Sequence, residues 1–165
     1  MSIPTQTEPK TTTQASQVKT LTYPQNPQEK LRQHFQLLGS ISFLMLHSPL
    51  HRRYQVERLE SQVLPSLIHN QFRLYMVNDN PIGFINWAWL SEDIEENFQT
   101  GEYHLHLDEW QSGDRLWFPE FIAPFGHTKE MVKDVRSNIF QKKTPAKALR
   151  IASDGTLRSI AHYTL

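Results

Sequence analysis

A serine, a histidine and a carboxylate stand out as residues that could together move a proton. Ser48 precedes His51 by three positions, and residues three apart share one face of a helix. The positive end of a helix dipole favours a neutral imidazole near a helix N-terminus, and a general base must be neutral. His51 is therefore a candidate general base. The alternative is a surface histidine beside Arg52 and Arg53, because the chain has eight histidines.

Glu120 is the second candidate, because it is the one charged residue in the apolar segment 116–125. An unpaired buried charge is very costly, so this carboxylate must be solvated, paired or functional. In a functional site it would orient His51 and stabilise the imidazolium, as the acid does in a Ser-His-Asp triad. The alternative is an exposed carboxylate on an edge strand, which Pro119 would suit. No Gly-x-Ser-x-Gly motif is present, so we interpret Ser48 as a helix cap.

A third group of polar residues alternates along the segment 103–108. His104, His106 and Asp108 would share one face of a strand there. Imidazole and carboxylate groups are ligands for zinc or iron. A solvated strand face explains the same pattern and is the interpretation we prefer, so no metal site is predicted.

The charges are segregated, although the formal net charge is zero. Residues 91–110 hold seven acidic and no basic residues, whereas residues 127–165 hold eight basic and three acidic residues. Lys129, Lys133 and Arg136 have the spacing of one helix face. Such a face is usually solvated, but it could also receive an acidic partner through electrostatic steering.

Composition excludes several classes of protein. The chain has no cysteine, which excludes disulfides, a cysteine nucleophile and cysteine-bound zinc. The zero net charge argues against a general nucleic-acid binder. No apolar run is long enough to span a membrane, and the N-terminus lacks an apolar signal core. We therefore expect a soluble cytoplasmic protein.

Two predicted helices must position His51. Sixteen of the first thirty residues are Thr, Gln or Pro, so we predict a disordered tail over residues 1–27 and a single domain over residues 28–165. A first helix begins near Glu29. A second begins at Ser48, runs to Leu67 and is kinked at Pro65. The apolar stripe expected on the first helix consists of Leu31, Phe35, Leu38, Phe43 and Met45.

Strands and a third helix must position Glu120. The patterns predict strands over residues 72–77, 82–90 and 103–108, a short aromatic strand near Trp117, and a final hairpin over residues 147–163. A turn at residues 78–81 joins the first two strands, residues 92–96 form a short helix or loop, and a helix covers residues 127–140. This order indicates an α+β fold, an α/β sandwich with a mixed, mostly antiparallel sheet and flanking helices.

Several blocks together resemble one enzyme family. Ser48-Pro49-Leu50-His51-Arg52 and the segment from Ser112 to Gly126 stand in the same order, and at similar separations, as in the RTX toxin-activating lysine acyltransferases. Three shorter blocks agree as well: Val63-Leu64-Pro65, Asn70-Gln71-Phe72 and Trp87-Ala88-Trp89-Leu90-Ser91. The resemblance covers roughly residues 37–150.

The resemblance implies a fold similar to the GNAT acyltransferases and a defined reaction. Members of this family transfer a fatty acyl group from acyl carrier protein to internal lysines of an RTX protoxin in the cytoplasm, and a homodimer is possible. No tightly bound cofactor is implied, because acyl carrier protein delivers the acyl-phosphopantetheine. The essential histidine matches His51 and the essential acid matches Glu120. Glu120 departs from the usual Asp, and Gln62, expected to support the site with Ser48, departs from an Asn.

The same resemblance suggests roles for two further sets of residues. The basic set would dock the acidic carrier protein: Arg52, Lys129, Lys133 and Arg136. The aromatic set would line a groove for the acyl chain, unless its members belong to the core: Trp87, Trp89, Trp117 and Phe118.

Two other functions remain open on the sequence. A coenzyme A-dependent GNAT-type N-acetyltransferase would need a glycine-rich loop at a helix N-terminus, and the six glycines here form no such cluster. A non-catalytic toxin chaperone or adaptor would not need His51.

Overall fold

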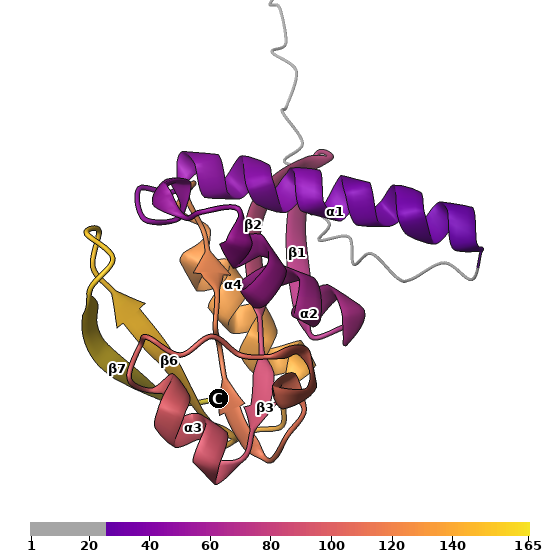
Figure 1. The fold of residues 1–165 in the computed structure, drawn as a ribbon. Helices are drawn as coiled ribbons and strands as arrows, with labels where there is room; N and C mark the ends of the chain where they lie inside the picture. The colour runs from indigo at the N-terminus through magenta and orange to yellow at the C-terminus, as the bar shows by residue number, and fades with distance from the viewer. Residues whose placement is uncertain (1–25) are drawn as a thin grey trace, which may run out of the picture.

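The computed structural model of the chain describes residues 26–165. Helices flank a mixed, mostly antiparallel arrangement of strands (Figure 1), which confirms the predicted α+β fold class. The predicted tail lies outside the described residues except for its last two positions. Among the helices that the structure describes, none combines the length and the apolar character needed to cross a bilayer.

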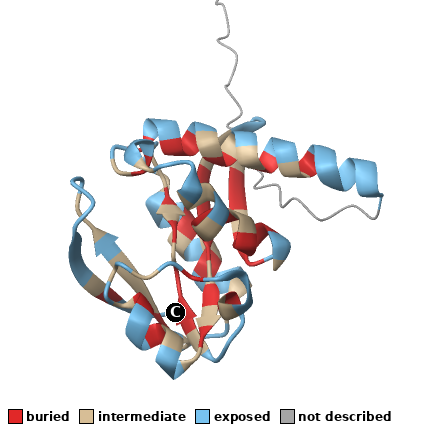
Figure 2. Ribbon diagram, in the orientation of Figure 1, coloured by how far each residue is buried: buried red, intermediate tan, exposed pale blue. Residues whose placement is uncertain are grey.

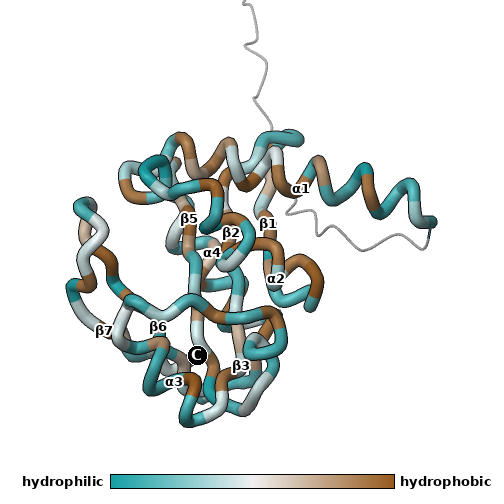
Figure 3. Tube along the Cα trace, in the orientation of Figure 1, coloured by the Kyte–Doolittle hydropathy of each residue, from teal (hydrophilic) through white to brown (hydrophobic). Residues whose placement is uncertain are grey.

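The first helix, α1 (Pro27–His47), forms near the predicted start but buries a different face. Asn26 caps it by accepting a hydrogen bond from the Gln28 amide at 3.0 Å. Its buried residues are Gln33, Leu37, Ile41, Leu44 and Met45. Three members of the predicted stripe are exposed instead: Leu31, Phe35 and Phe43. Apolar residues lie on two sides of α1, so spacing alone did not identify the side that packs on the strands (Figures 2 and 3).

The predicted second helix is divided into shorter segments. Ser48 ends α1, and its N–H donates to the Met45 carbonyl. A single 3₁₀ turn, η1 (His51–Arg53), follows. The chain becomes helical again at residues 57–58 and continues through the π-helix η2 (Leu59–Val63) into α2 (Leu64–Ile68). Pro65 has no N–H to donate to the preceding turn, which accounts for the widened π-helical turn before it.

The first sheet has the antiparallel order β1-β2-β5. Its strands are β1 (Phe72–Val77), β2 (Asn80–Asn86) and β5 (Phe121–Ile122). The predicted turn between the first two strands is confirmed. Asn78 and Asp79 have φ values of 49° and 61°, as a two-residue hairpin turn requires.

The second sheet has the order β3-β4-β6-β7. Its strands are β3 (Ala88–Leu90), β4 (Arg115–Trp117), β6 (Pro145–Ile151) and β7 (Leu157–Thr164). β4 and β6 run parallel and pair at only two positions, after which the Phe118 amide donates to the Lys147 carbonyl. Beyond Phe118 the chain leaves β6 and joins the first sheet as β5. The linker 118–120, which contains Glu120, therefore lies where the two sheets separate.

Helices cover the sheets and close the core. α1 and α2 pack on β1 and β2, while α4 (Thr128–Asp134) and the π-helix η4 (Val135–Ile139) pack on the opposite side. The helix predicted over residues 127–140 is thus confirmed. α3 (Glu92–Phe98) and the 3₁₀-helix η3 (Leu107–Trp110) contribute to a third cluster around Trp117.

The strand predicted over residues 103–108 does not form. The His106 amide donates to the Glu109 carboxylate at 2.7 Å instead of to a neighbouring strand, and this bond starts η3. Tyr103 donates to the same carboxylate at 2.6 Å. Local side-chain bonds therefore override the alternating pattern.

Gly113 explains why the Ser-Gly-Asp turn before β4 needs glycine. A Cβ atom there would lie 2.5 Å from the Leu90 carbonyl oxygen and 2.6 Å from the Ser91 Cα. The requirement is close approach of two backbones rather than a positive φ. This contact fixes the start of the segment that carries Glu120.

Candidate active site

Ser48, His51 and Glu120 form a continuous hydrogen-bonded array inside the protein. Ser48 Oγ lies 2.6 Å from His51 Nδ1, and His51 Nε2 lies 2.9 Å from Glu120 Oε2. All three side chains are buried, although His51 and Glu120 are 69 positions apart in the chain. The carboxylate that interrupts the apolar segment is therefore paired.

The bonding pattern sets the roles of the two ring nitrogens. If Glu120 is ionised, its oxygen accepts from Nε2–H, and Nδ1 is then free to accept from the Ser48 hydroxyl. The carboxylate thus fixes one tautomer and would balance the charge of an imidazolium. The array can take up one proton while remaining hydrogen-bonded.

The predicted cap role of Ser48 is wrong. Its side chain bonds His51 rather than a helix N-terminus, and its backbone ends α1. His51 itself lies in the three-residue turn η1. That turn is too short to supply the helix dipole on which the sequence argument relied.

Asn86 is a buried residue that the sequence analysis missed. Its side-chain Oδ1 accepts from the backbone N–H of Glu120 at 2.8 Å, and its backbone N–H donates to the backbone carbonyl of Glu120 at 3.2 Å. Its Nδ2 donates to the Gln62 carbonyl at 2.7 Å. One side chain therefore ties the end of β2 to η2 and to the backbone of the catalytic candidate Glu120.

Gln62, the predicted supporting residue, lies beside this group in η2. Its carbonyl accepts the Asn86 bond, and its buried side chain lines a pocket that also contains Glu120. Gln62 thus belongs to the site through its backbone as well as its side chain.

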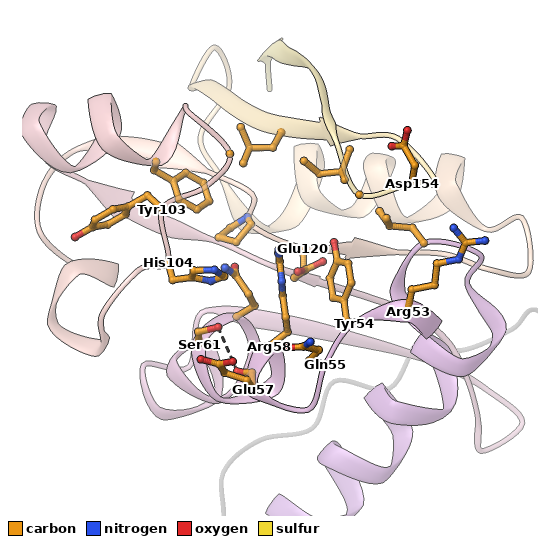
Figure 4. Close-up of a pocket in the computed structure, with 18 of the residues that line it drawn as sticks. Arg53, Tyr54, Gln55, Glu57, Arg58, Ser61, Tyr103, His104, Glu120 and Asp154 are labelled. Carbon is orange, nitrogen blue, oxygen red and sulfur yellow. Dashed lines mark hydrogen bonds between the residues drawn. The ribbon is translucent and has the colours of Figure 1, made fainter.

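A polar pocket of about 330 Å³ opens onto Glu120. Figure 4 shows Tyr54 and Arg58 side by side, extending toward Glu120. The apolar part of its lining includes Leu50, Phe98, Pro119, Leu149 and Ile151, and the charged part also includes Arg53, Glu57 and Asp154. The pocket therefore combines apolar walls with a buried carboxylate.

Tyr54 and Arg58 are further site residues that the sequence analysis missed. The Tyr54 ring packs edge-on against His51, with centroids 5.1 Å apart, and the Arg58 guanidinium lies 4.7 Å from its centroid. Burial raises the pKa of Tyr54, the Glu120 carboxylate raises it further, and Arg58 only partly offsets them. The phenol therefore keeps its proton at neutral pH.

The four aromatic residues predicted to line an acyl groove do not form one surface. Trp87, Trp89 and Phe118 pack around Phe140, with centroid distances of 5.3, 5.9 and 5.8 Å. Trp117 is fully buried in another cluster, and its Nε1–H donates to Glu95 at 2.6 Å. For Trp117 the groove prediction is wrong, because its ring has no exposed surface.

An apolar pocket of about 160 Å³ contains only Phe118 of that predicted set. It is lined mainly by Ile85, Phe118, Phe121, Val132, Val135 and Ala148. Three of its residues, Thr128, Val132 and Arg136, also line a shallow groove on α4 and η4 that holds Lys129 and Lys133. The predicted basic face thus borders an apolar pocket, whereas Arg52 lies outside both.

The alternating residues His104, His106 and Asp108 do not come together as ligands. His106 caps η3, and Asp108 lies within that turn. In residues 26–165, no group of three His, Asp or Glu side chains is arranged to hold a metal ion.

The site residues that the sequence analysis missed differ in how clearly the sequence pattern marks them. Asn86 is a polar residue inside the apolar strand predicted over residues 82–90, so the argument used for Glu120 applies to it. Tyr54 and Arg58 follow His51 closely, but nothing in their spacing places them beside Glu120.

Comparisons with known proteins found one family model and several similar proteins. A model described as the RTX toxin acyltransferase family matches residues 30–164. The lysine-acyltransferase RtxC of Vibrio cholerae is 41% identical over 111 residues, which cover 67% of this chain and 72% of that protein. The leukotoxin-activating lysine-acyltransferase LktC of a Pasteurella haemolytica-like species is 42% identical over 106 residues, 64% of each chain. An uncharacterised protein of Synechocystis is 40% identical over 131 residues, which cover 77% of this chain and 88% of that protein.

Proposed function

This chain belongs to the RTX toxin acyltransferase family, and we propose that it transfers a fatty acyl group from acyl carrier protein to internal lysines of an RTX protoxin. The curated relatives named above as lysine-acyltransferases support the enzyme class. The observation that carries the proposal is the buried Ser48–His51–Glu120 array at the junction of the two sheets. We place the reaction in the cytoplasm, where acyl carrier protein is found.

The array supplies the proton acceptor that this reaction needs. A lysine amine has an ordinary pKa near 10.4, so at neutral pH it is protonated and is no nucleophile. The ammonium group first loses one proton to solvent. The neutral amine then attacks the thioester carbonyl, the new C–N bond forms as the second proton passes to His51, the C–S bond breaks, and the carrier's thiolate takes that proton from His51 and leaves as a thiol. His51 holds the proton as an imidazolium, and Glu120, 2.9 Å away, balances its charge.

A covalent route through Ser48 is a second possibility. The 2.6 Å contact between Ser48 Oγ and His51 Nδ1 favours it, since a serine within reach of a base can act as a nucleophile. In that route the acyl group would first form an ester with Ser48. Trapping an acyl-enzyme in the absence of protoxin, and its loss in Ser48→Ala, would support this route over direct transfer.

The groove on α4 and the adjoining apolar pocket suit the donor. Lys129, Lys133 and Arg136 offer cations to an acidic carrier protein. The neighbouring pocket, which contains Phe118, offers apolar walls to the acyl chain. Phe118 is two residues from Glu120, so this pocket and the array are connected through the linker 118–120. No tightly bound cofactor is needed, because the carrier delivers the thioester.

Co-expression with an RTX protoxin tests the proposal. Mass spectrometry is expected to find fatty acyl groups on protoxin lysines with the wild-type chain. His51→Ala should lower acylation by at least about 100-fold, since it removes the proton acceptor.

The same experiment separates the alternatives. Acetylated lysines would indicate the coenzyme A-dependent reaction. Activation of the toxin without any lysine modification, unchanged in His51→Ala, would indicate a chaperone or adaptor and refute the proposal.

A further inference from the structure

The polar pocket beside Glu120 has no part in binding the donor as described above, and its chemistry matches a lysine side chain. A lysine has an aliphatic stem and a charged end. The pocket offers apolar walls, including Phe98, Leu149 and Ile151, and a buried carboxylate from Glu120. Tyr54 contributes an uncharged phenol next to that carboxylate.

The polar and apolar pockets lie on opposite sides of the sheet at β6. Ala148 lines the apolar pocket, whereas Leu149 and Ile151 line the polar pocket. Successive side chains of a strand point to opposite faces. A donor bound in the groove on α4 and the apolar pocket therefore leaves the polar pocket open to the acceptor.

Arg58 is the unusual member of this pocket. It is half-buried, and its guanidinium contacts the Tyr54 ring. Among the described residues it makes no ion pair or hydrogen bond to a carboxylate, unlike Arg115, which pairs with Glu92 and Glu95. A guanidinium carries five N–H donors in a planar fork that fits a carboxylate. The fork of Arg58 thus has donors that no carboxylate among residues 26–165 accepts from, and it can pair with an anionic group of a bound acceptor.

We propose that the polar pocket receives the acceptor lysine and that Arg58 selects lysines that have an acidic neighbour in the acceptor chain. The inference rests on the proposed function. The lysine enters between the apolar walls, its charged end faces Glu120, and a neighbouring Asp or Glu of the acceptor pairs with Arg58. The other arginine at the pocket, Arg53, is already tied by its Nη1 to the Ser153 carbonyl at 2.9 Å.

The test uses a protoxin that the wild-type enzyme acylates. The residues flanking one modified lysine are changed to glutamate, glutamine or lysine, and KM and kcat are measured for each acceptor with acyl carrier protein as donor. The wild type should prefer the glutamate-flanked lysine by about three- to tenfold in kcat/KM. Arg58→Gln should abolish the preference, and Arg58→Glu should reverse it toward the lysine-flanked acceptor.

Two controls make the result specific. Arg32→Gln removes an exposed arginine from α1, outside the pocket, and should keep the wild-type preference. The KM for acyl carrier protein should be unchanged in Arg58→Gln.

Two outcomes would overturn the inference while leaving the proposed function intact. One is lysine acylation that does not respond to the flanking charges. The other is a raised KM for the carrier in Arg58→Gln, which would assign Arg58 to the phosphate of the donor. Absence of lysine acylation by the wild type would instead refute the proposed function.

Discussion

Asn86 controls how Glu120 faces His51. Its side chain and its backbone hold the Glu120 backbone from both sides, at 2.8 and 3.2 Å. A carboxylate on a linker between two sheets would otherwise depend on the short strand β5 for its position. Asn86 is thus a positioning residue, which acts on the reaction only through Glu120.

Asn86→Ala should lower kcat by about 10- to 100-fold with little change in either KM, because small displacements of catalytic groups have effects of this size. It should also cost about 1–3 kcal/mol of stability, since the Glu120 amide and the Gln62 carbonyl lose their buried partner. Steady-state kinetics and thermal melts measure the two effects separately.

Asn86→Asp provides the matched comparison. It keeps the oxygen that accepts from Glu120 but loses the donor to Gln62, so it should retain more activity than Asn86→Ala. A pH–rate profile that stays identical to wild type in both variants, with kcat reduced only in proportion to folded protein, would assign Asn86 a purely structural role.

The sequence identified part of this site for a physical reason. Glu120 conflicts with its apolar surroundings, and such a conflict can be seen without coordinates. Its pairing with His51 was a hypothesis from triad chemistry, to which the family resemblance added support, because no spacing rule joins residues 69 positions apart. Ser48 was misassigned as a cap because Ser-Pro is typical of helix starts. Only the structure shows that its hydroxyl is bonded to His51.

At the scale of the elements, Glu95 connects α3 to both strands of the parallel pair. It accepts from Trp117 on β4 at 2.6 Å and contacts Arg115 at 3.1 Å and Lys147 on β6 at 3.1 Å. Burial raises the pKa of Glu95, but these partners outweigh it and hold the pKa below the ordinary value. The ionised form therefore stabilises the fold.

The pH dependence follows from this direction. The stabilisation is fully present above the unfolded-state pKa near 4.5 and is lost as the pH falls through the lower folded-state pKa. Glu95→Gln should cost about 1–3 kcal/mol at pH 7, and its free energy of unfolding should fall less steeply below pH 4.5 than that of the wild type. Equal slopes in urea melts between pH 3 and 5 would contradict the role of Glu95.

Elements with strong local signals were predicted well, and those decided by tertiary contacts were not. The β1–β2 and β6–β7 hairpins follow from their turn residues and alternating patterns. The predicted strand at 103–108 failed because Glu109 captures the local donors. The buried face of α1 was misjudged because both of its sides carry apolar residues, and only packing on the strands selects one.

At the scale of the whole molecule, basic residues from the C-terminal part of the chain gather along one groove on the surface. Lys129 and Lys133 line one groove beside the apolar pocket. Lys129→Glu together with Lys133→Glu should raise KM for acyl carrier protein about tenfold at low salt, with kcat little changed, because opposite charges steer the encounter. The dependence of KM on salt should become shallower.

The matched control compares single variants: Lys30→Glu makes the same charge change as Lys129→Glu alone, but on the exposed N-terminal part of α1. It should leave KM for the carrier unchanged. An equal rise in KM with Lys30→Glu would mean that net charge, rather than the groove, governs carrier binding.

The outer side of α1 has a practical consequence. Leu31, Phe35 and Leu46 keep 56, 66 and 66% of their surface exposed, and a molecule with a formal charge of zero has little electrostatic repulsion to keep its copies apart. Colloidal stability should therefore be poorest near the isoelectric point of about 7.1. Ammonium sulfate should salt the protein out early at that pH, and buffers one or two pH units away should dissolve it again.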